Sequence, residues 1–116
     1  MDSQTTVSDL RFAVDRFVAA RNWYEFHTPK NLAMSIAIEA AEIMEHFQWS
    51  EVTQSAEDVK NEKFRTEVAD ELADVLIYAL SFATVSGIDV SEAIFKKLAR
   101  NEVRFPIEKV RDKLGA

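Results

Sequence analysis

The chain has 116 residues, with 14 Lys and Arg against 20 Asp and Glu, two Gly, two Pro and no Cys. This length suits one domain with a single core, and the formal charge of −6 argues against a nucleic-acid-binding surface, which needs net positive charge. The absence of Cys excludes a disulfide framework and a Cys-based zinc site. Two distant glycines exclude glycine-rich phosphate loops, and the scarcity of turn residues disfavours a many-stranded sheet. The expected fold class is all-α.

No targeting or membrane-spanning segment is expected. The first residues lack the basic and apolar regions of a signal peptide. The longest uncharged run, residues 75–88, is shorter than the roughly 20 residues needed to cross a bilayer. We therefore expect a cytoplasmic protein that binds neither membranes nor nucleic acid.

The first half of the chain predicts two helices and a linker. The first helix runs from about residue 8 to 22, on the spacing of its apolar residues. The second begins at Thr28-Pro29, a capping hydroxyl followed by proline at the first helical position, and ends near residues 49–50. A polar linker over residues 51–61 has room for a short helix.

The second half predicts two more helices. The third runs from about residue 62 to 86 and stops at Gly87, a plausible residue for a helix C-terminus. Asp89 and Glu92 form a possible capping box for the fourth helix, which Pro106 ends. The whole chain, 1–116, is expected to form one domain with its core at about 8–106 and a peripheral tail at 107–116.

The apolar pattern of the third helix predicts a partner subunit. Residues 75–83 are apolar nearly all round the helix, and such a helix must be covered on every side. The three other helices of a chain this small have little apolar surface with which to cover residues 75–83. A central helix inside a monomer is the alternative, and a homodimer or homotetramer is the expectation.

Two acidic pairs stand where core residues are expected. Glu39 and Glu42 on the second helix are three residues apart and lie within an apolar stretch, and Glu71 and Asp74 repeat this spacing on the third helix. Glu45 continues the spacing on the second helix. If the two helices pack antiparallel, four carboxylates meet in a partly apolar cleft, where proximity and desolvation raise their pKa values.

A divalent cation would resolve this conflict. Oxygen ligands favour Mg²⁺, or Mn²⁺ in its place, and Mg²⁺ is often bound together with substrate phosphates. A solvated acidic face is the ordinary alternative for a single pair, but two pairs flanked by apolar residues favour a site. A di-iron bundle would need a Glu-x-x-His motif from each of two helices, and neither His27 nor His46 has a Glu three residues before it.

At these residues the sequence resembles the MazG-like all-α nucleoside triphosphate pyrophosphatases, above all the dCTP pyrophosphatase branch. The ExxE…ExxD pattern of that family is present as Glu39-Ala-Ala-Glu42 and Glu71-Leu-Ala-Asp74. Three further stretches are similar, and they begin with Trp23, Phe47 and Lys97: WYEFHTPKNL, FQW and KLARNEVRFP. The similarity covers about residues 10–106. One departure is that Ile38 and Ala41 precede the two glutamates, where the dCTP branch commonly has glycine; this puts base preference in doubt more than catalysis.

The resemblance implies a four-helix bundle completed by homo-oligomerisation, and Mg²⁺-dependent hydrolysis of a (d)NTP, with dCTP or a related nucleotide expected, to the monophosphate and pyrophosphate. Metal ligands would be Glu39, Glu42, Glu71 and Asp74, and one of them or Glu45 would orient or deprotonate the attacking water. The substrate would be bound by His27, Asn31, Trp49, Tyr78, Lys97, Asn101 and Arg104, with the last two and Lys97 on phosphates and the others around the nucleoside.

Two other functions stay open at this point. The acidic pairs could form the partner-binding surface of a non-catalytic helical interaction module. The chain could also be a related phosphohydrolase that acts on a diphosphate or a modified nucleotide.

Overall fold

The computed structural model describes residues 1–109 of the chain, and these residues contain helices and no strand. The elements in chain order are α1 (Val7–Ala20), the 3₁₀ helix η1 (Trp23–Phe26), α2 (Pro29–Phe47), α3 (Ser55–Asp58), α4 (Glu62–Ser86) and α5 (Val90–Arg104). The expected all-α class is confirmed. Residues 110–116, most of the predicted peripheral tail, lie outside the described residues.

Local capping sets the helix boundaries that the sequence predicts. The Thr28 hydroxyl accepts the backbone N–H of Asn31 at 3.1 Å, and Pro29 occupies the first turn of α2. The Asn61 side chain accepts the N–H of Phe64 at 3.0 Å and begins α4. At the other end of α4, Gly87 adopts a left-handed φ of 66°. Each of these boundaries depends on residues within one helical turn.

Two local features differ from the sequence-based expectation. Asp89 accepts the N–H of Glu92 at 2.8 Å, but the Glu92 side chain pairs with Lys96, and among the described residues it makes no return bond to Asp89, so only half of the expected capping box forms. The complete capping box begins α1, where Thr6 and Asp9 bond each other's backbone N–H at 2.9 and 3.0 Å.

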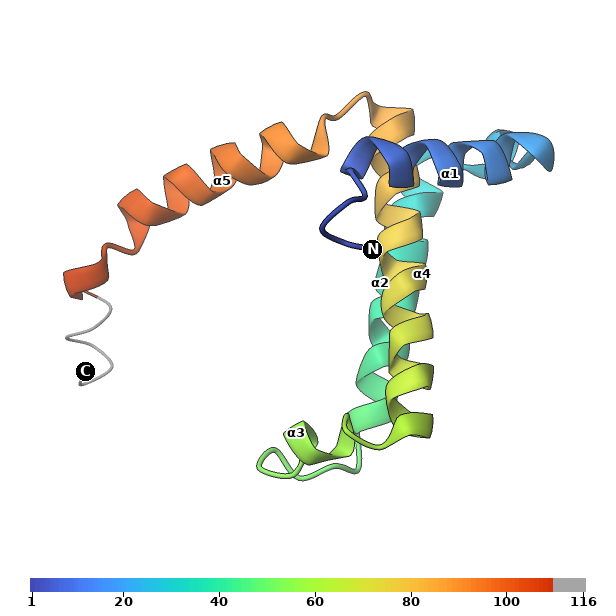
Figure 1. Ribbon diagram of the computed structural model, residues 1–116. Coiled ribbons are helices and arrows are strands. Elements are labelled where there is room, and N and C mark those ends of the chain that lie inside the picture. The colour runs from blue at the N-terminus through green and yellow to red at the C-terminus, as the bar shows by residue number, and fades with distance from the viewer. Residues whose placement is uncertain (110–116) are drawn as a thin grey trace.

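The centre of the molecule is the antiparallel pair of α2 and α4, with α1 lying across α4 (Figure 1). Val18 of α1, Leu32 of α2 and Ala83 of α4 are the buried apolar residues of the described chain. Arg11 of α1 donates from its guanidinium to the Ile88 carbonyl at 2.6 Å, which ties α1 to the end of α4. The α2–α4 seam is therefore the surface on which the acidic pairs can meet.

Helix α5 leaves this pair. It follows α4 after a bend of 99° and extends away from α2 and α4 (Figure 1). Apolar side chains on it are open to solvent, among them Phe95 at 71% exposed. One chain thus pairs α2 with α4 and leaves α5 apart, so the complete four-helix bundle stays a prediction. Within the described residues, no single helix is long and apolar enough to cross a membrane, although α4 and α5 pass that test jointly by length and composition.

Gly87→Ala is expected to lower the free energy of unfolding by about 1 kcal/mol, because an L side chain is strained at a left-handed φ. A Cβ at this position meets no atom within 4 Å, so backbone strain is the only cost. Urea unfolding at fixed protein concentration measures it. Gly87→Asn is the matched control and should lose less, since Asn tolerates this conformation; equal losses in both variants would contradict the strain argument.

Candidate functional site

Three glutamates from two helices meet at the α2–α4 seam. Glu39 and Glu42 lie one turn apart on α2, and Glu71 faces them from α4. One carboxylate oxygen from each of these residues lies within 4.8 Å of the other two, and all three residues are half-buried. The three are called the carboxylate cluster below. The antiparallel packing of α2 and α4 is what turns two local spacings into one site.

Two other predicted acids lie beside the cluster. Asp74 is half-buried one turn after Glu71, and its charge acts on Glu39. Asp74 also lines a cavity between α1 and α4 that is described below. Glu45 lies one turn after Glu42 and is exposed. Asp74 therefore borders the cluster on the side of that cavity, and Glu45 lies at its open edge.

The cluster keeps protons in the absence of a cation. A hydrogen bond shared with Glu42, burial, and the charges of Glu42 and Asp74 raise the pKa of Glu39 from 4.5 to about 7. The same kind of bond to Glu42, together with burial, raises the pKa of Glu71. The hydrogen bonds from Glu71 and Glu39 lower the pKa of Glu42. Within the cluster, Glu42 therefore has a lowered pKa, whereas Glu39 and Glu71 have raised ones.

The cluster fits a hard divalent cation. One oxygen of Glu39 and one of Glu71, each named Oε2, are buried and have no hydrogen-bond partner. Unpartnered buried carboxylate oxygens are costly unless a ligand satisfies them. The donors are all carboxylate oxygens, the ligand type that Mg²⁺ and Mn²⁺ prefer.

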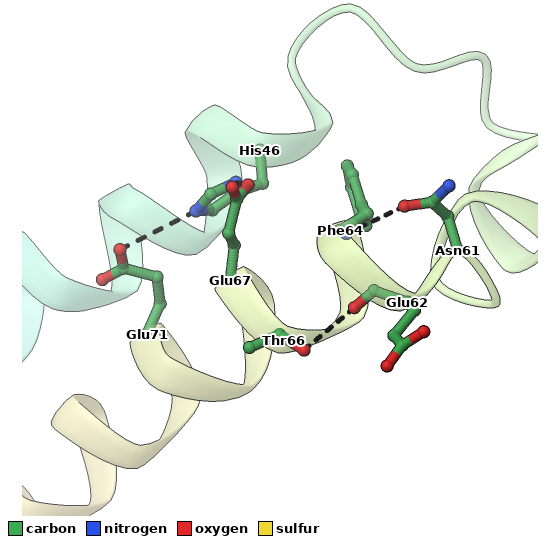
Figure 2. A network of polar contacts seen from close by, with 7 residues as sticks. All are labelled: His46, Asn61, Glu62, Phe64, Thr66, Glu67 and Glu71. Carbon is green, nitrogen blue, oxygen red and sulfur yellow. Dashed lines mark hydrogen bonds and ion pairs between the residues drawn. The ribbon is translucent and has the colours of Figure 1, made fainter.

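His46 also contacts the cluster, and sequence reasoning missed it. Its Nε2 lies 3.7 Å from Oε1 of Glu71, and its Nδ1 lies 3.8 Å from Oε2 of Glu67 (Figure 2). His46 stands four residues after Glu42 and thus on the same face of α2, which was the available signal. Its alignment with Glu67 and Glu71 depends on how α2 and α4 are offset, which no local pattern specifies.

A cavity of about 210 Å³ opens between α1, η1 and α4, beside Asp74. Its lining residues are Phe17, Val18, Trp23, His27, Asp74, Ile77, Tyr78 and Ser81. Nδ1 of His27 and Oγ of Ser81 are buried there without a hydrogen-bond partner. Ser81, which is 1% exposed, was also missed, although a serine within the apolar stretch 75–83 was a signal. The cavity therefore has mainly apolar walls with Asp74 among them, and the unpartnered polar atoms of His27 and Ser81 are buried in those walls.

Contacts of η1 hold His27 at this cavity. Asn22 takes a left-handed conformation before η1, which asparagine tolerates. The Tyr24 hydroxyl donates to the Asp15 carboxylate of α1, and burial followed by this bond raises the pKa of Tyr24 to about 12. The Asn31 side-chain amide donates to the Phe26 carbonyl at 3.0 Å. Asn31 thus braces η1 against the start of α2.

Four predicted substrate-binding residues lie apart from the cluster within one chain. Trp49 follows the C-terminal end of α2 and is 90% exposed, whereas the cavity lies near the start of that helix. Lys97 and Arg104 are exposed, and Asn101 is half-buried, on the outlying helix α5. A single chain therefore gathers His27 and Tyr78 near the cluster, but not these four.

Comparisons with known proteins show which family the chain resembles. The sequence profile of the MazG-like family matches residues 34–113. The chain is 34% identical over 104 residues to dCTP pyrophosphatase 1 of Mus musculus and 32% identical over 103 residues to that of Homo sapiens, covering 90% and 89% of this chain. It spans 61% of the length of these curated relatives. A stretch of 34 residues, 29% of this chain and 32% of the relative, is 62% identical to the dATP/dGTP diphosphohydrolase of Cyanophage S-2L.

A solved structure is similar as well. The crystal structure of a pyrophosphatase from Archaeoglobus fulgidus DSM 4304 superimposes with a TM-score of 0.79 at 41% sequence identity, and the match covers 85% of this chain and 91% of that one. The helical fold is therefore shared with that pyrophosphatase. The chain belongs to the MazG-like family.

Metal-free protein is expected to lose stability as the pH rises from about 5 to about 8. The pKa of Glu39 is about 7 in the folded chain against an ordinary 4.5, so its contribution is complete below about 4.5 and disappears as the pH passes 7. The raised pKa of Glu71 acts in the same direction, and the lowered pKa of Glu42 acts only below this range. Melting temperatures in a chelator measure the fall.

Two variants and the addition of Mg²⁺ test why the melting temperature of metal-free protein decreases with pH. Glu39→Gln removes the titrating group and should remove most of the decrease, whereas Glu45→Gln, at the exposed neighbour, should retain it. Adding Mg²⁺ at about pH 8 should raise the melting temperature of the wild type, because binding to the folded state stabilises it. A pH-independent melting temperature in metal-free wild type would contradict the coupling within the cluster.

Proposed function

We propose that the chain is a divalent-metal-dependent pyrophosphohydrolase that converts a (d)NTP, with dCTP or a related nucleotide as the expected substrate, to the monophosphate and pyrophosphate. The observation that carries this proposal is the carboxylate cluster, with buried oxygens of Glu39 and Glu71 that have no partner. The curated relatives are named dCTP pyrophosphatase 1 and dATP/dGTP diphosphohydrolase, which supports the same reaction class.

Mg²⁺ is the proposed metal, with Mn²⁺ able to replace it. Glu39, Glu42 and Glu71 would hold it, and Asp74 would complete the set from the side of the cavity. A bound divalent cation neutralises phosphate charge and lowers the pKa of a coordinated water. The proton that Glu39 holds up to about pH 7 would leave when the cation binds, because the cation favours the ionised carboxylate.

In the proposed reaction, side chains of this protein assist the attack of water on the substrate. A water oxygen attacks the α-phosphorus, the bond from that atom to the bridging oxygen breaks, and pyrophosphate leaves. One carboxylate of the cluster, or the exposed Glu45 beside it, orients this water and accepts its proton. The reaction needs no nucleophilic side chain.

The cavity between α1 and α4 is the proposed nucleoside pocket. Its volume of about 210 Å³ is below the roughly 300 Å³ of the smallest drug-sized sites, so it suits one ring system rather than a whole nucleotide. The polar atoms of His27 and Ser81, which are buried without a partner in the cavity walls, would turn toward the edge of the base, and Tyr78 would contribute an aromatic wall. Asp74 lines this cavity and neighbours the cluster, which suits a substrate whose phosphates extend from one to the other.

A homodimer or homotetramer is proposed as the active form. The accessible surface of one chain is 9412 Å², whereas a compact monomer of 13.2 kDa exposes about 6,400 Å². The radius of gyration, 17.6 Å, also exceeds the roughly 13 Å of a compact domain of this size. The surplus surface includes Leu76 and Ile77 in the apolar half of α4, which are 53% and 40% exposed.

A second copy would also complete the site. Lys97, Asn101 and Arg104 follow each other at spacings of four and three residues on α5, so they share one face of that helix. Because α5 extends away from its own cluster, we propose that these residues reach the phosphates bound by another copy. Trp49, exposed at the far end of α2, would contribute to a site across the interface in the same way.

A panel of nucleotides with Mg²⁺, analysed for pyrophosphate and orthophosphate, tests the reaction. Wild type should release pyrophosphate, and Glu39→Gln or Asp74→Asn should reduce the rate by at least about 100-fold with the circular dichroism of the helices unchanged. Asp70→Asn, at an exposed acid of α4, is the control and should retain activity. Release of orthophosphate alone would favour the related phosphohydrolase. No release from any nucleotide would favour the helical interaction module.

Mixing two inactive variants tests the shared site. Glu71→Gln damages the cluster, and Lys97→Ala combined with Arg104→Ala damages α5. Refolded together, the two chains should recover about a quarter of wild-type activity, because half of randomly paired dimers contain one undamaged composite site of two. Each variant refolded alone is the control. No recovery in a mixture that forms hybrid oligomers would place α5 and the cluster of one chain in the same site.

A further inference from the structure

His46 faces two carboxylates of α4 with its two ring nitrogens. Figure 2 shows the imidazole on α2 between Glu67 and Glu71, with the contact to Glu71 drawn. The side chain of His46 is 23% exposed and that of Glu71 is 22% exposed, whereas Glu67 is 48% exposed. The three side chains therefore run in order from the solvent to the carboxylate cluster.

The two carboxylate oxygens of Glu71 have different surroundings. Oε1 lies 3.7 Å from Nε2 of His46, and Oε2 is buried without a partner. A carboxylate that is held by one oxygen has lost much of its rotational freedom, so the other oxygen is available in a defined place. Side chains that orient a metal ligand in this way commonly change metal affinity by about 10- to 100-fold when they are removed.

The ring itself is held on both sides. Phe64 packs edge-on against His46 with ring centroids 6.0 Å apart, and Phe47 packs in the same manner on Phe64 at 5.1 Å. The bond from the Phe64 N–H to Asn61 fixes the start of α4 that carries this phenyl ring (Figure 2). Glu67 lies 3.8 Å from Nδ1 on the remaining side. The imidazole is thus set in place before any ligand arrives.

We propose that His46 is a positioning residue for metal binding: it holds Glu71 in the orientation that the cation requires, and Glu67 in turn holds His46. The inference rests on the proposed function, because it assigns Glu71 as a metal ligand. Contacts of 3.7 and 3.8 Å are longer than direct hydrogen bonds. The expected effect is therefore at the lower end of the range for such residues.

Direct binding of Mn²⁺ to metal-free protein, without nucleotide, tests the proposal by electron paramagnetic resonance. His46→Leu should bind Mn²⁺ about tenfold more weakly than wild type. His46→Gln should stay within about threefold, because its amide nitrogen can occupy the place of Nε2 and donate to Glu71. His46→Asn places its amide near Nδ1 and should not rescue binding. Glu67→Gln should weaken binding by a few-fold, and Asp70→Asn should leave it unchanged.

Kinetics separate positioning from a role in the chemical step. The Mg²⁺ concentration for half-maximal rate should rise about tenfold in His46→Leu, while kcat at saturating Mg²⁺ stays within about twofold of wild type. A ring that acted only as a positive charge would repel the cation, and His46→Leu would then bind Mn²⁺ more tightly. Unchanged or tighter binding in that variant, or rescue by Asn as good as by Gln, overturns the proposal.

The same titration distinguishes this failure from failure of the proposed site. Glu39→Gln lacks a ligand of the cluster and should bind Mn²⁺ far more weakly than wild type, whatever His46 does. If Glu39→Gln binds Mn²⁺ as tightly as wild type, the assignment of the carboxylate cluster as the metal site is wrong. If Glu39→Gln loses binding and His46→Leu does not, only the positioning role is wrong.

Discussion

Repulsion between carboxylates that helix packing forces together is the interaction on which the rest of the structure depends. The α2–α4 seam holds Glu39, Glu42 and Glu71 so close that the cluster cannot ionise fully by itself, and Glu39 keeps its proton to about pH 7. Apolar contacts along the seam maintain this arrangement. The fold thus holds an unfavourable charge distribution in place, and the proposed cation would relieve it.

Under the proposed association of copies, one event would complete both the burial of apolar surface and the site. One chain buries few apolar side chains and leaves Leu76, Ile77 and Phe95 open to solvent. The same chain directs α5, with its cationic side chains, away from the cluster (Figure 1). Association of copies would cover the first group and bring the second to the phosphates, so stability and activity would depend together on protein concentration.

Local features of this chain could be predicted from its sequence, and features that depend on the relative placement of helices could not. Thr28, Asn61 and Gly87 act within one turn, so the ends of α2 and α4 follow from residue type. The spacing of Glu39, Glu42 and Glu71 likewise places them on inward faces. The contacts of His46 have no such local cause, because they depend on the offset of two helices. The break before α5 follows from Gly87 and Asp89, but residue type does not specify the angle of 99° between the two helices.

The metal side and the base side of the proposed site lie on different elements. The carboxylate cluster belongs to α2 and α4, whereas His27 is held by η1, which the Tyr24–Asp15 and Asn31–Phe26 bonds fasten to α1 and α2. Asp74 lines the cavity and lies close enough to the cluster for its charge to act on Glu39. A change at Ser81 or in η1 can therefore alter which base fits without moving the carboxylates, whereas a change in the α2–α4 offset alters the reaction for every base. If the small cavity is the nucleoside pocket, as we propose, base preference is separable from catalysis in this fold and is decided there.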